Sequence, residues 1–177
     1  MNDVIRGYWA GAKNNGDFIC IETNSGYRGG RLDYKGKQHL LSPDANYEDL
    51  GVAVLDALAH SRFVLGAPRD GSIYPQDVEF DMELYDYKLT AERYAKWLAD
   101  LMAHYGYKSK RGLFKNMHNC SIESCNGLIT ISPWHHEKLE AWDGEGIAKE
   151  DNVIIPANST PAEIGAALSL AFSRCTG

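Results

Sequence analysis

The fold is built around a predicted β-hairpin near the start of the chain. Its sequence is Val4-Ile5-Arg6-Gly7-Tyr8-Trp9-Ala10-Gly11-Ala12-Lys13-Asn14-Asn15-Gly16-Asp17-Phe18-Ile19-Cys20-Ile21-Glu22. Its Asn15-Gly16 pair tolerates the left-handed backbone of a tight hairpin turn, so residues 4–12 and 17–22 are predicted to form two strands. Farther along the chain, Asn126-Gly127 precedes Leu128-Ile129-Thr130-Ile131 in the same way. Antiparallel pairing is therefore predicted at both places.

Hydrophobic spacing predicts three helices. The clearest covers residues 90–105, with Thr90 placed to cap its start and Gly106 its end. Its apolar residues repeat at the i, i+3, i+4, i+7 spacing of one helical face: Tyr94, Trp97, Leu98, Leu101, Met102 and Tyr105. A second helix is predicted over residues 47–62, and a third begins at Thr160-Pro161-Ala162-Glu163, which supplies a capping hydroxyl, a first-turn proline and a carboxylate.

Two of these helices belong to similar units. Short strands are predicted at Gln38–Leu41 and Asn152–Ile155, and each is followed by Pro or Ser-Pro and then by a capped helix. Asp49-Leu50-Gly51-Val52-Ala53-Val54 in the first helix resembles Glu163-Ile164-Gly165-Ala166-Ala167-Leu168 in the last. A glycine inside a helix costs up to about 1 kcal/mol relative to alanine, so we expect each to allow close packing on the sheet or on the other helix.

Composition indicates one globular domain over residues 1–177. The chain is 44% hydrophobic and 24% charged, with a net charge of −6, and at this length a domain buries about 70% of its surface. No stretch approaches the roughly 20 apolar residues of a membrane span, and no signal peptide is recognisable, so a cytoplasmic protein is expected. The fold class is predicted to be α/β (α+β), with a largely antiparallel mixed sheet and about three packed helices.

The segment Asp77-Val78-Glu79-Phe80-Asp81-Met82-Glu83-Leu84 alternates carboxylate and apolar side chains over eight residues. Period two predicts a strand whose apolar residues face the core and whose carboxylates share the other face. Three interpretations compete: a solvated sheet face protected from aggregation, a docking surface for a basic partner, and a hard-metal site. The metal site is the least favoured, because ligands strung along one strand diverge.

Two other clusters contain side chains that could bind a ligand. Lys108, Lys110, Arg111 and Lys115 form a basic group after a helix C-terminus, which we interpret as a solvated loop, with nucleic-acid binding as the alternative. The second group could bind zinc but lacks the usual ligand spacing: His118, Cys120, Cys125, His135 and His136. The four cysteines form no C-x-x-C pair, no catalytic motif is present, and neither a cofactor nor enzyme activity is predicted.

Several stretches together resemble the bacterial contact-dependent growth inhibition (CDI) immunity proteins. They span most of residues 40–175: Tyr94-Ala95-Lys96-Trp97-Leu98, Tyr105-Gly106-Tyr107-Lys108-Ser109-Lys110, Leu113-Phe114-Lys115-Asn116-Met117, Cys120, Ile131-Ser132-Pro133, Lys138-Leu139-Glu140-Ala141-Trp142, Val153-Ile154-Ile155-Pro156 and Gly165-Ala166-Ala167-Leu168. The resemblance implies a small cytoplasmic α/β protein that neutralises the C-terminal toxin domain of a large exported adhesin. Many such toxins are nucleases, often acting on transfer RNA.

Charge links the resemblance to the acidic segment. A toxin that grips a polynucleotide needs a cationic cleft, and an acidic inhibitor surface speeds its capture. The toxin-binding residues are predicted to be the alternating carboxylates and their neighbours: Asp77, Glu79, Asp81, Glu83, Asp86, Tyr74 and Tyr85. Loops around Trp134 or Trp142 are the alternative surface, and a nucleic-acid-binding module or a zinc-dependent enzyme is the alternative function. Neither a membrane nor a direct nucleic-acid partner is expected.

Overall fold

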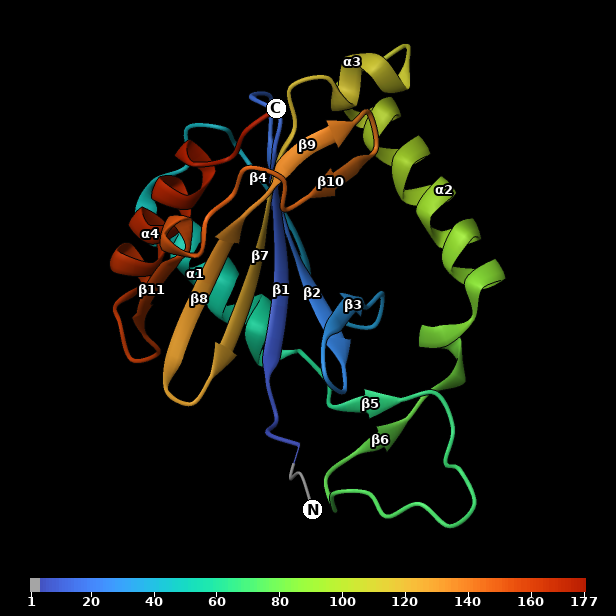
Figure 1. Cartoon of the computed structure of the whole chain (residues 1–177). Helices are drawn as coiled ribbons and strands as arrows, with labels where there is room; N and C mark the ends of the chain where they lie inside the picture. The colour runs from blue at the N-terminus through green and yellow to red at the C-terminus, as the bar shows by residue number, and fades with distance from the viewer. Residues whose placement is uncertain (1–3) are drawn as a thin grey trace.

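The computed structural model describes residues 4–177 as one large antiparallel sheet with helices on both faces (Figure 1). The sheet order is β11-β8-β7-β1-β2-β3, and β4 also pairs with β2. Its strands are β1 (Tyr8–Asn14), β2 (Ile19–Gly26), β3 (Gly30–Leu32), β4 (Gln38–Leu41), β7 (His118–Cys125), β8 (Leu128–Pro133) and β11 (Val153–Pro156). The α+β class and the antiparallel sheet predicted from the sequence are confirmed.

Both predicted hairpins form. β1 pairs with β2 around a turn in which Gly16 has φ +91°, and the Asn15 side chain accepts hydrogen bonds from the backbone N–H groups of Asp17 and Phe18. β7 pairs with β8 around Asn126-Gly127, where both residues have positive φ. The first strand begins at Tyr8, later than the predicted residue 4.

Helices α1 (Tyr47–Ala59) and α4 (Pro161–Ser173) cover one face of the sheet. Asn46 caps α1 by accepting from the Asp49 N–H, and Thr160 and Glu163 form the predicted capping box of α4. Their apolar faces enclose the main core with the inward side chains of the sheet: Ala12, Ile19, Ile21, Leu50, Val54, Leu58, Ile122, Ile129, Ile131, Ile164, Leu168 and Phe172.

The similarity between the two units extends to their three-dimensional arrangement. Each unit is a β-hairpin followed by a short strand and a helix, and the strand order β4-β2-β1-β7-β8-β11 is symmetric about the central β1–β7 pair. A Cβ on Gly51 would lie 1.7 Å from the Pro161 carbonyl oxygen, and one on Gly165 would lie 1.8 Å from the Tyr47 carbonyl oxygen. These reciprocal positions show that the two glycines let the backbones of α1 and α4 touch.

The opposite face carries helices α2 (Tyr87–Tyr105) and α3 (Lys110–Phe114) and the hairpin of β9 (His135–Lys138) and β10 (Ala141–Asp143). A second core lies beneath them: Phe18, Cys20, Leu98, Leu101, Leu113, Phe114 and Met117. Gly106 ends α2 in the left-handed conformation as predicted, but Asp86 caps its start instead of Thr90. The basic cluster lies in and around α3, so the loop prediction was wrong for Lys110 and Arg111, whereas all four cations are exposed as predicted. Within residues 4–177, no helix has the length and apolar character needed to cross a bilayer.

Residues 64–87 extend beyond one end of the sheet (Figure 1). This extension contains β5 (Val64–Leu65), β6 (Glu79–Phe80), which pairs with β5 in parallel, and the 3₁₀ helix η1 (Met82–Tyr85). A second short 3₁₀ helix, η2 (Lys149–Asp151), precedes β11. The extension connects α1 on one face of the sheet to α2 on the other.

Replacing either helix glycine by alanine should destabilise the fold. Gly51→Ala or Gly165→Ala gains about 1 kcal/mol of helix propensity, but the added methyl group forces the two helix backbones apart. We therefore expect the free energy of unfolding, measured with urea, to fall by roughly 2–4 kcal/mol. The double variant should lose less than the sum, because one separation of the helices relieves both clashes. Gly144→Ala, where an added Cβ meets no atom within 4 Å, is the matched control. Parental stability in Gly51→Ala would contradict the backbone contact.

Candidate functional site

The acidic segment does not form the predicted eight-residue strand. Only Glu79–Phe80 lies in a strand, and Asp81 then caps η1 by accepting a hydrogen bond from the Glu83 N–H at 3.0 Å. The predicted inward face is also wrong: Leu84 is buried, but Phe80 and Met82 are 42% and 72% exposed. β5 offers a partner strand of only two residues, so the ladder cannot continue past Phe80.

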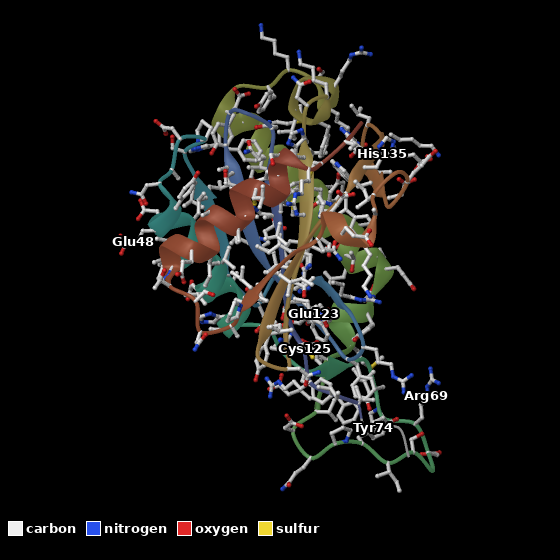
Figure 2. The ribbon with its side chains drawn as sticks, turned by 60° about the vertical axis from the view of Figure 1, so that its left-hand side comes forward. Glu48, Arg69, Tyr74, Glu123, Cys125 and His135 are labelled. Carbon is white, nitrogen blue, oxygen red and sulfur yellow. The ribbon has the colours of Figure 1, made fainter. Side chains whose placement is uncertain are left out.

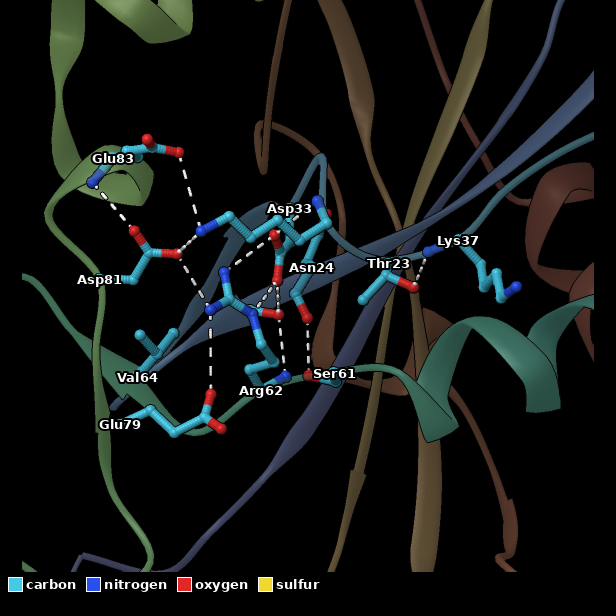
Figure 3. A network of polar contacts seen from close by, with 12 residues as sticks. Thr23, Asn24, Asp33, Lys37, Ser61, Arg62, Val64, Glu79, Asp81 and Glu83 are labelled. Atoms are coloured by element: carbon cyan, nitrogen blue, oxygen red, sulfur yellow. Dashed lines mark hydrogen bonds and ion pairs between the residues drawn. The ribbon is translucent and has the colours of Figure 1, made fainter.

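The carboxylates converge on cations from distant parts of the chain. Arg62, just after α1, holds Asp33 through two hydrogen bonds of 2.7 and 3.1 Å and contacts Asp81 at 3.0 Å and Glu79 at 3.8 Å (Figure 3). Lys35 lies 2.8 Å from the same Asp81 oxygen and 3.7 Å from Glu83. The predicted uninterrupted row of like charge is therefore a mixed-charge network that fastens the extension to the sheet.

Asp33 is the buried centre of this network. Its side chain is 1% exposed and also accepts a hydrogen bond from the Ser25 hydroxyl at 2.7 Å. Burial alone would raise the pKa of Asp33, but the hydrogen bonds from Arg62 and Ser25 outweigh it and hold the pKa below its usual value. A hydrogen bond from Lys35, aided by Arg62, lowers the pKa of Asp81 in the same direction. Both carboxyls are thus held as anions.

Three of the predicted carboxylates remain on the outside of the extension. Asp77, Glu79 and Glu83 keep 55%, 60% and 56% of their side chains exposed, although Asp77 pairs with Arg6 and Glu83 with Arg93, both at 3.1 Å. Asp86 is exposed but serves as the cap of α2. The outward charge is therefore smaller than the sequence suggested, because cations from four other segments share it.

The two predicted tyrosine anchors are partly buried. The Tyr85 hydroxyl donates to the Val64 carbonyl oxygen at 2.7 Å, and the Arg31 guanidinium lies 4.2 Å from its ring centre. The Tyr74 hydroxyl accepts from the Arg69 N–H, and the Tyr74 ring packs edge-on against Phe80. Figure 2 shows Tyr74 and Arg69 together on the extension. Both tyrosines therefore pack within the extension, and neither is fully exposed.

Other aromatic and apolar side chains do project, and the sequence analysis missed them. Ile73 is 86% exposed and Tyr87 is 84% exposed, and Phe80 and Met82 of the same extension are exposed as well. The period-two pattern predicted that Phe80 and Met82 face the core. They are exposed because β5 is too short to continue the ladder beyond Phe80, and the sequence pattern does not reveal the length of the partner strand.

A groove between α2 and the sheet is a second surface that the sequence did not reveal. It encloses a cavity of about 440 Å³, whose lining includes Tyr34, Leu40, Arg93, Trp97 and His104. Leu98 and Leu101 are the buried residues of α2, and Figure 1 shows the N-terminal end of this helix lying away from the sheet. Trp97 and Tyr94 pack against the second core, as their helical spacing predicts, but both are only partly buried.

The residues that could bind zinc do not assemble, in keeping with their unfavourable spacing in the sequence. Cys120 is buried in the main core, and Cys125 lies far from His135 in Figure 2. Burial, with help from His136, lowers the pKa of His118. Among residues 4–177, the three-residue group with metal-ligand spacing consists of His135, Asp143 and Glu145, whose ligand atoms lie within 4.8 Å of one another. Of these three residues, only His135 belongs to the zinc-capable group identified from the sequence.

The comparisons with known proteins agree with one another. The family model described as "CdiI: CDI immunity protein" matches residues 8–175. Immunity protein CdiI-YPIII from Yersinia pseudotuberculosis serotype O:3 (strain YPIII) is 55% identical over the full length of both chains.

Two solved structures resemble the fold closely. One is a toxin and immunity complex, CdiA-CT/CdiI, from Yersinia pseudotuberculosis, with a TM-score of 0.94 and 54% identity over 98% of this chain and 100% of that one. The other is a protein of unknown function from Neisseria meningitidis, with a TM-score of 0.81 and 39% identity over 99% of each chain. The chain therefore belongs to the CdiI family of CDI immunity proteins, which are inhibitors and not enzymes.

Proposed function

We propose that this protein binds the C-terminal toxin domain of a CDI adhesin and blocks it by occupying a basic surface that the toxin uses. The observation that carries the proposal is full-length similarity to a chain solved in a CdiA-CT/CdiI toxin and immunity complex. The fold supports an inhibitor role, because a rigid sheet with two helix-covered faces presents fixed surfaces to a partner. Of the residues on which the zinc-enzyme alternative was based, only His135 belongs to the group with metal-ligand spacing.

The toxin is proposed to be a nuclease. The protein carries 24 acidic against 18 basic side chains, and an excess of negative charge suits a partner whose cleft binds phosphates. Transfer RNA is the substrate that the family resemblance implies.

The extension is the proposed docking surface. Its exposed Ile73, Phe80, Met82 and Tyr87 provide an apolar centre, and the outward carboxylates Asp77, Glu79 and Glu83 provide an acidic rim. Stable interfaces combine these two features, the apolar centre supplying affinity and the charged rim supplying speed. Asp81, Asp86, Tyr74 and Tyr85 hold the segment in shape beneath that surface.

Toxin inhibition can be measured directly. The cognate toxin domain should cleave transfer RNA, and an equimolar amount of this protein should abolish the cleavage. Plasmid DNA is included as a second substrate. A toxin that leaves both polynucleotides intact would contradict the nuclease proposal, and full cleavage by the mixture would contradict inhibition.

Charge reversal on the extension should slow association with the toxin. We expect Asp77→Lys/Glu79→Lys to lower the association rate about tenfold at low salt and to flatten its salt dependence, because steering acts mainly on the encounter. Stopped-flow or surface-plasmon kinetics provide the measurement. Glu137→Lys/Glu150→Lys makes the same change in net charge at exposed positions elsewhere and is the control. Equal rates for the two variants would remove the extension from the encounter surface.

The network beneath the extension predicts a pH dependence. In the folded protein the pKa of Asp81 lies below the value near 3.9 that an aspartate has in an unfolded chain. Its contribution to the free energy of unfolding is therefore complete above about pH 5 and is lost as the pH falls through the folded pKa. Asp81→Asn should cost about 1–2 kcal/mol at pH 7, because Lys35 is half exposed, and should flatten the acid limb of stability. Urea unfolding at several pH values between 3 and 7 tests this. An unchanged acid limb would mean that Asp81 is not held by the network.

A further inference from the structure

Two cysteine thiols from distant parts of the chain meet at the edge of the main core. Cys120 lies in β7 and Cys175 follows the end of α4, yet their sulfur atoms are 3.7 Å apart. Neither thiol is used by the docking surface proposed above. Of the other two cysteines, Cys20 is buried and donates to Glu22 at 3.1 Å, and Cys125 lies at the far end of β7.

The two thiols differ in a way that suits stepwise oxidation. Cys120 is 1% exposed, whereas Cys175 is partly exposed to solvent. The hydrogen bond between the two thiols is the main cause that lowers the pKa of Cys175 to about 7, and the same contact together with burial raises the pKa of Cys120. A partly exposed sulfur beside a buried one is the arrangement of an attacking and a resolving thiol.

We propose that Cys175 and Cys120 form an oxidation site that a hydroperoxide converts into an intramolecular disulfide. The Cys175 thiolate attacks one peroxide oxygen, the O–O bond breaks, and the leaving oxygen takes a proton from solvent, which gives a sulfenic acid on Cys175. The Cys120 thiol then attacks that sulfur, so that the S–S bond forms, the S–O bond breaks and water departs with the Cys120 proton. The two thiols lose two electrons and the hydroperoxide gains them.

The bond would fasten the C-terminal segment to the centre of the sheet. Thr176 already bridges to β9, because its carbonyl oxygen accepts from the His136 N–H at 2.8 Å and its N–H donates to the Trp134 carbonyl oxygen at 3.3 Å. A link between Cys175 and β7 would therefore fix both the last residues and the start of β9. It would also close a loop of 55 residues in the unfolded chain, which should raise the melting temperature by about 5–10 °C.

Hydrogen peroxide treatment of the purified full chain tests the proposal. Thiol titration after denaturation should fall from four to two, and non-reducing peptide mapping should find Cys120 joined to Cys175 within one chain. Dithiothreitol should restore all four thiols and the original melting temperature. Cys125→Ser, the matched control, should still form the disulfide, whereas Cys120→Ser should stop at a Cys175 sulfenic acid that dimedone traps.

Four outcomes would overturn the proposal. They are four intact thiols after treatment, a disulfide that includes Cys20 or Cys125, a disulfide between two chains, and irreversible oxidation of Cys175 with Cys120 still reduced. If Cys120→Ser does not fold, the peptide map of the parent protein decides alone, because it needs no variant.

Discussion

The backbone contact between α1 and α4 fixes how the two helices cover the sheet. Two glycines at equivalent positions let the helices touch, and only then can both lie flat on the same face of a six-strand span from β4 to β11. The symmetric strand order gives each helix the same support. Because this face is closed by the pair, the opposite face is left for α2, the β9–β10 hairpin and a groove, and the end of the sheet is left for the extension.

Arg62 connects the extension to α1 and the sheet. It leaves the end of α1, reaches the buried Asp33 beside β3, and from there contacts the carboxylates of residues 79–81. The acidic segment was interpreted as a binding surface from the sequence, but its contacts with Arg62 and Lys35 also hold the extension in place. The part available to a partner is what the network leaves outside, namely exposed apolar side chains with carboxylates at their margin.

Local signals in the sequence predicted most of the fold. The Asn15-Gly16 and Asn126-Gly127 turns, the capping box at Thr160 and the glycine pair depend on nearby residues or on a repeated motif, and each was found as expected. The strand prediction for the acidic segment was wrong because the structure of this segment depends on Lys35 and Arg62. No local sequence pattern connects these two residues to it. The site was predicted only as a region: the carboxylates were identified, but their internal partners, the exposed Ile73 and Tyr87 and the α2 groove all arise from tertiary packing.

Our proposal that the toxin docks on residues 64–87 can be tested by hydrogen–deuterium exchange of the full chain with and without its cognate toxin domain. Docking there predicts that toxin slows amide exchange throughout the extension, including the exposed backbone around Ile73. Protection confined to the groove lined by α2 and the sheet, with exchange in the extension unchanged, would contradict the claim.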